Sequence, residues 1–332
     1  MKFFYPKYFI VILVSVLLVS VSQIANANWN AEVIVINFPT DSNPNSPVKA
    51  AAVKFEQLVS LRLDPNIVQA KTYDLGNKDP FEELELGNAQ IIAPPLSLLK
   101  RYSDRMQVFE LPFLFYSAEA AEEFSDGEWG KRLLESLSLS GIEAHGYLHR
   151  GMKNLTSDEL ILNPDDLIDK KLGIFNSNTA EKHYEVLSVN TVNLTVQAGA
   201  SALDNNLVDA LENNWVNIYN QSIHNKQQFI FESRPAYTGN VMFITEKIRD
   251  AIPEELQVVL EQIIEDSIKH GNELAKQLNN RYRNLIANSQ SNTVNQLTVD
   301  QRNQWVEASR KVWTAYENQI GTQLINAAAS HL

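Results

Sequence analysis

The sequence has 332 residues, with 28 Lys and Arg against 40 Asp and Glu, which gives a formal net charge of −12 at pH 7. This acidic balance argues against binding to a nucleic-acid backbone, which requires clusters of Lys and Arg. The absence of cysteine excludes disulfides, thiolate metal sites and a cysteine nucleophile. A hydrophobic content of 44% is sufficient for globular cores, and the length fits two domains of ordinary size.

The first 27 residues have the pattern of a secretory signal peptide. Lys2 and Lys7 provide a positive start, the run 9–21 is almost wholly apolar, and Ala25-Asn26-Ala27 is a small-residue cleavage motif. The apolar run is shorter than the roughly 20 residues that a spanning helix needs. An uncleaved N-terminal anchor is the alternative. We therefore expect cleavage after Ala27 and a periplasmic protein without a lipid anchor, because the chain has no cysteine to carry one.

Strand and helix patterns alternate along the rest of the chain, which predicts an α/β architecture with largely parallel strand pairing. In the first half we expect strands at 32–38, 66–73 and 91–93, and helices beginning at Pro47, at Pro80 and at 118, the last of these running to 137 with a break at Gly127. In the second half we expect strands at 144–148, 171–175, 191–196 and 208–211, and helices at 179–187, 201–207 and 214–225.

The longest periodic segment lies at 253–287. Apolar residues recur there at the spacing of one helical face, from Leu256 to Ile286. At 1.5 Å per residue such a helix is about 50 Å long. This length exceeds the width of one ordinary lobe and suits a spine shared by two. Gly271 interrupts the pattern, so two helices that meet at this glycine are the alternative.

Five short motifs follow one another in a fixed order behind the signal peptide. They are Leu75-Gly76, Leu111-Pro112-Phe113-Leu114-Phe115, Gly151-Met152-Lys153-Asn154-Leu155-Thr156, Asp165 to Asn176, and Val208-Asp209-Ala210-Leu211-Glu212-Asn213. They resemble, in turn, the Q-L-G, L-P-F-L-F, G-x-R-x-x-T, D-L-x-G-x-K-[IL]-R-x-x-N and V-D-G-x-E-N motifs of solute-binding proteins from tripartite ATP-independent periplasmic (TRAP) transporters. The resemblance extends over residues 30–290 and is to the C4-dicarboxylate-binding (DctP-like) family.

This resemblance implies an α/β, two-lobed periplasmic-binding-protein-like fold (type II-like), with a central cleft and a long helix spanning both lobes. We expect lobe I to comprise 28–149 plus 239–279, and lobe II to comprise 150–238 plus 280–332. The family implies a receptor that closes about a hinge on one small molecule and delivers it to small and large TRAP membrane subunits. No enzymatic activity, no cofactor and no bound metal are expected.

The resemblance also implies a ligand site between the lobes. By position, Lys153 and Gly173 stand where the family has two arginines that grip a carboxylate. Asn176 and Asn213 match asparagines of the second lobe, and Asn37 matches one of the first. Asparagine also serves to cap turns, which is the alternative for Asn176 and Asn213.

Gly173 is the main departure from the family pattern. Arginine offers a planar fork to both oxygens of a carboxylate, whereas glycine has no side-chain donor. Lys153 keeps a positive charge, and Arg234 is expected to compensate near the hinge, unless it pairs with Glu232. Arg150 is a second candidate for this role.

These residues leave the ligand class open. The persistent cation at Lys153 favours a small organic acid, and the loss of the arginine at Gly173 leaves a neutral polar solute as the alternative. A receptor that presents its ligand to a sensory partner is a further alternative.

Other kinds of site find no support in the sequence. His145 and His149 lie in a strand-like segment, where residues four apart are separated by about 13 Å, which is too far for a shared metal. The sequence contains no H-E-x-x-H, G-x-S-x-G, G-x-G-x-x-G or Walker A motif.

Overall fold

The computed structural model describes residues 33–138, 141–175 and 177–330, and the segment from Ile34 onward forms one compact unit. The expected signal peptide lies outside the described residues. The strands are β1 (Ile34–Thr40), β2 (Val68–Asp74), β3 (Ile91–Ile92), β4 (Ile142–Met152), β5 (Asn154–Ser157), β6 (Lys171–Ile174), β7 (Asn190–Asn193), β8 (Ala210–Asn213), β9 (Phe229–Glu232), β10 (Tyr237–Thr245) and β11 (Thr293–Gln296).

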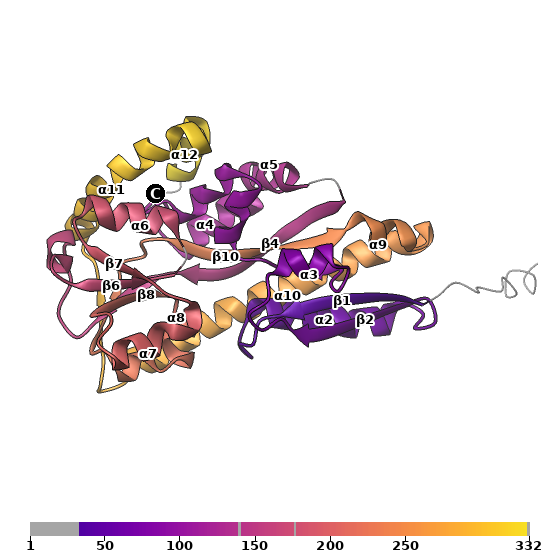
Figure 1. The fold of residues 1–332 in the computed structure, drawn as a ribbon, viewed down its shortest axis with the longest axis horizontal. Coiled ribbons are helices and arrows are strands. Elements are labelled where there is room, and N and C mark those ends of the chain that lie inside the picture. Colours follow the sequence, from indigo (N-terminus) through magenta and orange to yellow (C-terminus); the bar gives the residue numbers. More distant parts are fainter. Residues whose placement is uncertain (1–32, 139–140, 176, 331–332) are drawn as a thin grey trace, which may run out of the picture. The chain divides into compact units, whose positions relative to one another are not determined.

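Helices connect and cover these strands (Figure 1). The α-helices are α2 (Pro47–Arg62), α3 (Pro80–Glu85), α4 (Ala118–Asp126), α5 (Glu128–Leu137), α6 (Asn178–Val186), α7 (Gly199–Asp204), α8 (Trp215–Asn220), α9 (Glu246–Ala251), α10 (Glu254–Ala287), α11 (Val299–Ile320) and α12 (Thr322–Ala329). The 3-10 helices are η1 (Leu96–Arg101), η2 (Asp104–Glu110), η3 (Pro164–Leu167), η4 (Val196–Ala198) and η5 (Ile223–Asn225).

Among the described residues the strands form three sheets. β1 and β2 pair in parallel, β10 lies antiparallel between β3 and β4, and six strands follow the order β11-β9-β5-β8-β6-β7. In the six-stranded sheet, β5 runs antiparallel to β8 and β9, whereas β6 is parallel to β7 and β8. The expectation of largely parallel pairing was therefore wrong, because β4 and β10 carry the chain out and back as an antiparallel pair.

The sheets define two lobes. In the first lobe, α2 packs against β1 and β2 through a buried cluster that includes Ile36, Phe38 and Phe55. In the second lobe, the six-stranded sheet carries buried side chains on both faces, with Leu172 in one cluster and Leu211 in the other. The N-terminus of α2 follows the sequence expectation, because Ser46 caps the helix and Pro47 occupies its first position.

The long segment is one continuous helix. α10 has 34 residues and contacts α2 and β4 as well as α8 and β11, so it touches both lobes (Figure 1). Gly271 does not divide it, and the alternative of two helices was wrong. A Cβ at this position would lie 2.7 Å from the backbone oxygen of Pro47 and 2.9 Å from Leu148 Cδ2. The glycine therefore allows close approach of α10 to α2 and β4.

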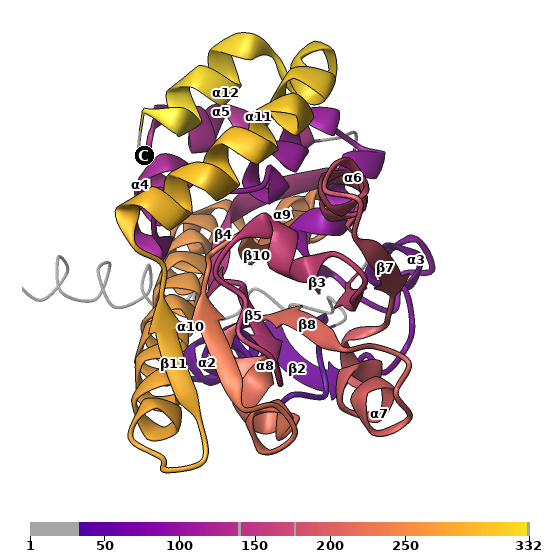
Figure 2. The ribbon, with the colours of Figure 1, turned by 90° about the vertical axis from the view of Figure 1, so that its left-hand side faces the viewer.

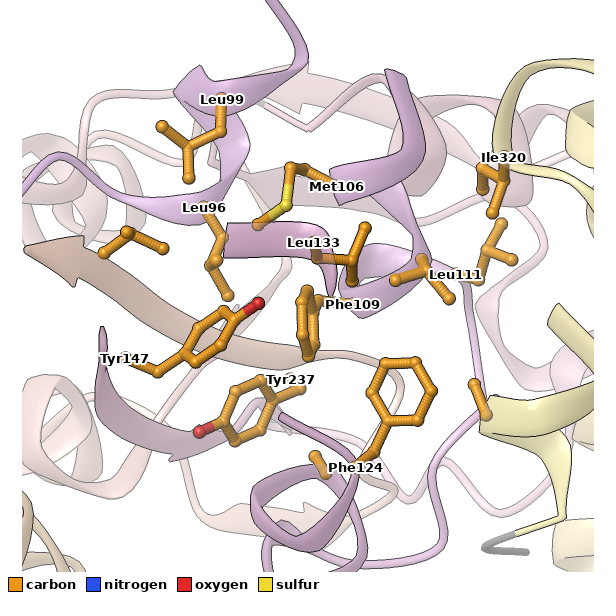
Figure 3. Packing of buried hydrophobic residues seen from close by; sticks show 14 of the residues in the cluster. Leu96, Leu99, Met106, Phe109, Leu111, Phe124, Leu133, Tyr147, Tyr237 and Ile320 are labelled. Carbon is orange, nitrogen blue, oxygen red and sulfur yellow. The ribbon is translucent and has the colours of Figure 1, made fainter. Parts of the chain in front are cut away.

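The largest buried cluster joins η1, η2, α4 and α5 to the strands β4 and β10 (Figure 3). The ring of Phe109 lies 5.4 Å from that of Tyr147 and 6.1 Å from that of Tyr237. The C-terminal helices α11 and α12 cover this cluster (Figure 2), and Trp313 of α11 donates its ring N–H to the backbone oxygen of Pro112 at 2.8 Å. The sequence expectations did not include these two helices.

Local departures from the expected elements have simple backbone causes. Gly127 separates α4 from α5, as expected. The helix expected over 214–225 ends instead at Asn220, because Ser222 adopts a left-handed conformation with φ 56° before the short turn η5. In the part of the chain that the structure describes, no helix has both the length and the apolarity to cross a bilayer.

We expect Gly271→Ala to destabilise the protein, although alanine is the better helix former. The added methyl must displace Pro47 or Leu148, and overpacking of this kind costs about 1–3 kcal/mol. Urea unfolding of the mature protein measures this change. Gln277→Ala on the exposed face of α10 is the control and is expected to stay within about 0.5 kcal/mol of wild type. An unchanged or raised stability of Gly271→Ala would contradict the packing argument.

Candidate functional site

Two crossings of the chain between the lobes are adjacent, and α10 also passes from one lobe to the other. Lys153 is the single residue between the end of β4 and the start of β5. The return crossing runs from the end of β9 at Glu232 to the start of β10 at Tyr237. The backbone N–H of Lys153 donates to the backbone oxygen of Ala236 at 2.9 Å, which joins the two crossings. Lys153 therefore lies at the connection between the lobes.

A cavity of about 450 Å³ opens beside these crossings. Its size suits a small organic molecule. Both lobes contribute to its lining, and the polar and charged contributors are Asp41, Ser42, Asn43, Asn77, Lys78, Ser97, Glu110, Arg150, Lys153, Thr195, Gln197, Asn213, Asn214, Asn217, Thr238 and Asn240. Amide side chains are prominent in this set, and they supply both donors and acceptors of hydrogen bonds.

Lys153 reaches the cavity as part of a buried ionic group. Its side chain is 9% exposed, and its Nζ lies 3.3 Å from Oε2 of Glu212, which is 1% exposed. Glu212 also accepts a hydrogen bond from the hydroxyl of Tyr184. Burial, together with the charge of Glu212, raises the pKa of Tyr184, so this hydroxyl remains a donor. Glu212 thus holds the charged ammonium group of Lys153 in place.

Arg150 lines the same cavity from the end of β4. Its Nε donates to Oδ1 of Asn240 at 2.6 Å, and its guanidinium forms an ion pair with Asp41 in the loop after β1. Its backbone oxygen accepts from Nδ2 of Asn279 on α10 at 3.1 Å. Arg150 therefore connects the loop after β1, strand β10 and the long helix at one edge of the cavity.

Asn213 presents an unused donor to the cavity. Its Oδ1 accepts from the backbone N–H of Asn214 at 3.0 Å and from Nδ2 of Asn217 at 2.8 Å. Its own Nδ2 is buried and has no hydrogen-bond partner among the described residues. Because buried polar groups are nearly always paired, this donor is available to an acceptor on a bound molecule.

Only some of the expected site residues line the cavity. Lys153 and Asn213 line the cavity, whereas Asn37 and Arg234 are not among its described lining residues. Asn37 uses its backbone to pair with Gln90, donating to Oε1 at 2.8 Å. Asn176 lies outside the described residues.

The two candidate arginines lie in different surroundings. Arg234 has a positive φ of 54°, and its charge acts on Glu119, Glu232 and Arg302, none of which lines the cavity. Arg150 is within the lining. The geometry favours Arg150 as the arginine of the site, and a ligand contact by Arg234 stays a prediction that these positions do not support.

Apolar side chains occupy the space beside Gly173. A Cβ at this position would lie 2.3 Å from Cδ2 of Leu211 and 2.9 Å from Cδ1 of Leu194. Leu211 is two residues before Asn213 on β8, the strand that pairs with β6. The missing arginine is thus replaced by hydrocarbon packing behind the cavity wall.

Among the cavity residues that the sequence expectations missed, three have notable contacts or surroundings, and the sequence carried a signal for one of them. Asn217 of α8 donates to Oδ1 of Asn213 at the end of β8, a contact across the turn at Asn214 that no sequence period predicts. Glu110 is a carboxylate directly before an apolar run, which is an unusual place for a charge. Asn240 lies within β10 and bonds Arg150 and the backbone oxygen of Ala93, and no motif distinguished it.

Amide contacts also join the lobes away from the crossings. Nδ2 of Asn45 lies 3.2 Å from Oδ1 of Asn220, and Nδ2 of Asn220 lies 3.1 Å from Oδ1 of Asn43. Asn43 and Asn45 belong to the loop after β1, whereas Asn220 ends α8. These exposed contacts connect the first lobe to the second beside the cavity.

Two lobes, a pair of crossing strands and a polar cavity lined from both sides define a solute-binding protein. The family comparison identifies the class further. Residues 38–319 match the model of DctP, described as bacterial extracellular solute-binding protein, family 7, and the chain belongs to this family. The resemblance inferred from the five motifs is thereby confirmed.

Similar proteins of known description support the same assignment. The chain is 31% identical over 290 residues to a C4-dicarboxylate-binding periplasmic protein of Shewanella loihica, covering 86% of each chain. It is 26% identical to the corresponding protein of Vibrio cholerae, covering 92% of each. These relatives are binding proteins, so the chain is an extracytoplasmic solute receptor and not an enzyme, as expected.

Solved structures confirm the two-lobed fold. A TRAP periplasmic solute-binding protein from Shewanella oneidensis with bound succinate is 30% identical, with a TM-score of 0.82 over 90% of this chain and 99% of that one. A protein of the same kind from Pseudomonas aeruginosa with bound L-malate is 26% identical, with a TM-score of 0.77 over 85% of this chain and 100% of that one.

We expect Gly173→Ala to lower the free energy of unfolding by about 1–3 kcal/mol, because the new methyl overlaps Leu211 and Leu194. In the Leu211→Ala background the same change is expected to cost less, since the overlapping atom is gone. A double-mutant cycle from urea unfolding measures this coupling. Simple additivity of the two substitutions would contradict the assignment of Leu211 as the group that fills the space.

Proposed function

We propose that this protein captures a small organic acid in the cavity between its lobes and delivers it to the small and large membrane subunits of a TRAP transporter. The observation that carries the proposal is the unpaired Nδ2 of Asn213, a residue that lines the same cavity as Lys153 and Arg150. A carboxylate is the acceptor that best matches one amide donor and two cations.

The two cations have different parts in this proposal. Arg150 presents a planar guanidinium, the group suited to bidentate contact with a carboxylate, and its ion pair with Asp41 positions it. Lys153 supplies a point charge, and its distance of 3.3 Å from Glu212 leaves its other donors for a ligand. The ligand-contacting set that we propose is therefore Arg150, Lys153 and Asn213, with Asn217 orienting Asn213.

Capture would be accompanied by closure of the lobes about the crossings at Lys153 and Ala236. We propose lobe I as 28–149 plus 239–279 and lobe II as 150–238 plus 280–332, with α11 packed against both η2 and α6. The contacts of Asn43 and Asn45 with Asn220 would hold the lobes together in the closed form. A ligand that binds the closed form more tightly than the open form shifts the population toward the closed form. The membrane subunits would bind this closed, ligand-loaded form.

The N-terminal pattern assigns the site of action. Cleavage after Ala27 would release the mature receptor into the periplasm. The periplasmic relatives of Shewanella loihica and Vibrio cholerae support this location, and the membrane partner is proposed from the family alone.

A neutral polar solute is the second candidate. It is favoured by one observation, the replacement of an arginine by Gly173 with Leu211 and Leu194 packed into the space. The amide-rich lining suits hydroxyl groups equally well.

The test compares two arginines of the same chain. The mature protein is unfolded, freed of any co-purified molecule, refolded and titrated calorimetrically with a panel of C3 to C6 organic acids and of neutral polyols. We expect a carboxylic acid to bind and Arg150→Met to weaken it by roughly 10- to 100-fold, the effect of removing a charged hydrogen bond. Arg234→Met, outside the cavity, is expected to change the affinity less than about threefold.

Thermal unfolding of both variants controls for folding. Binding of neutral polyols without any acid would replace the first candidate by the second. Equal weakening of ligand binding by Arg150→Met and Arg234→Met would show that the arginine in the cavity contributes no more to binding than the arginine outside it.

A further inference from the structure

Each cation that lines the cavity already has an acidic partner. Lys78 lies 3.1 Å from Glu83, Arg150 pairs with Asp41, and Lys153 lies 3.3 Å from Glu212. Glu110 is the one acid in the described lining for which no ion pair is found within the described residues. Glu110 is therefore the acid of the described lining whose carboxyl group has no ion-pair partner.

Glu110 is the last residue of η2 and is buried where it meets the cavity. The Ser177 hydroxyl forms a hydrogen bond with its carboxyl, and Lys153 is the cation that acts on it most strongly. Burial raises the pKa of Glu110, and the positive charge of Lys153 opposes this rise. A buried carboxylate is stabilised by a hydrogen-bond donor and destabilised by a second carboxylate beside it.

The neighbouring lysine restricts which donor fits. An ammonium group placed against Glu110 would also approach Lys153, and like charges at short distance repel. A hydroxyl group donates a hydrogen bond without a charge and avoids this repulsion. The pair formed by Glu110 and Lys153 thus matches a hydroxyl on a molecule whose carboxylate is held by the cations and by Asn213.

We propose that Glu110 is a specificity-determining residue that accepts a hydrogen bond from a hydroxyl of the ligand, so that this receptor selects hydroxy acids over otherwise identical acids that lack the hydroxyl. This inference rests on the proposed function, because it assumes that an organic acid occupies the cavity.

The test uses three acids of one carbon skeleton. Succinate has no substituent, L-malate adds a hydroxyl and L-aspartate adds an ammonium. Titration calorimetry of the refolded mature protein at pH 7 is expected to give L-malate a Kd at least about tenfold below that of succinate, since a hydrogen bond to a charged group is lost with the hydroxyl. L-aspartate is expected to bind no more tightly than succinate.

Substitution of the carboxylate separates recognition from folding. Glu110→Gln keeps the shape and removes the charge, and we expect the malate-to-succinate ratio to fall below about threefold, chiefly through tighter binding of succinate. Glu82→Gln, on the exposed face of α3, is the matched control and should keep the wild-type ratio. The ratio in the wild-type protein needs no variant, so it tests the inference even where Glu110→Gln does not fold.

The outcomes distinguish the two levels of the proposal. Equal affinity for succinate and L-malate, or an unchanged ratio in a folded Glu110→Gln variant, overturns the role of Glu110 and leaves the organic-acid receptor intact. Tighter binding of L-aspartate than of L-malate also overturns it. Failure of every carboxylic acid to bind overturns the proposed function and this inference together.

Discussion

The structure depends on the hydrogen bond between the backbone N–H of Lys153 and the backbone oxygen of Ala236. It joins two crossings of the described chain. One runs from β4 into β5, and the other runs from β9 into β10. The two crossings therefore lie side by side, and the cavity opens beside them. Because Lys153 lies at this connection, its ammonium group can pair with Glu212 in one lobe while its charge acts on Glu110, next to the other lobe's core.

The long helix supports this connection from behind. Asn272 of α10 accepts from the backbone N–H of His149 at 2.8 Å, and Asn279 donates to the backbone oxygen of Arg150 at 3.1 Å. Farther along, Arg283 forms an ion pair with Glu232 at the end of β9. Polar side chains one or two turns apart on a single helix therefore hold both crossing strands, and the apolar face between them packs into the lobes. The rigidity of α10 is what fixes the geometry at the connection.

The sequence predicted the elements whose pattern is local. The amphipathic period predicted α10 as one helix, and the alternative of a break at Gly271 stayed open because the contact of this glycine with Pro47 arises only from tertiary packing. The strands β5, β9 and β11 were not expected, and their place in one sheet depends on pairing between segments far apart in the chain. At the site, Lys153 and Asn213 line the cavity, as the motifs led us to expect. The choice between Arg150 and Arg234 depended on the fold, because Arg150 of β4 lines the cavity and Arg234, in the segment between β9 and β10, does not, and sequence spacing does not specify this difference.

Gly173 has a consequence for how the binding preference of this protein can change by mutation. With Leu211 and Leu194 packed where a side chain at this position would begin, an arginine cannot be introduced by one substitution without first opening a space in the core. Such a path must pass through a change at a leucine that is not among the described lining residues of the cavity. The residue type at position 173 is thus tied to the stability of the second lobe. Change in binding preference is then constrained by packing, so that diversification at this site proceeds more easily through the polar lining than through an arginine at position 173.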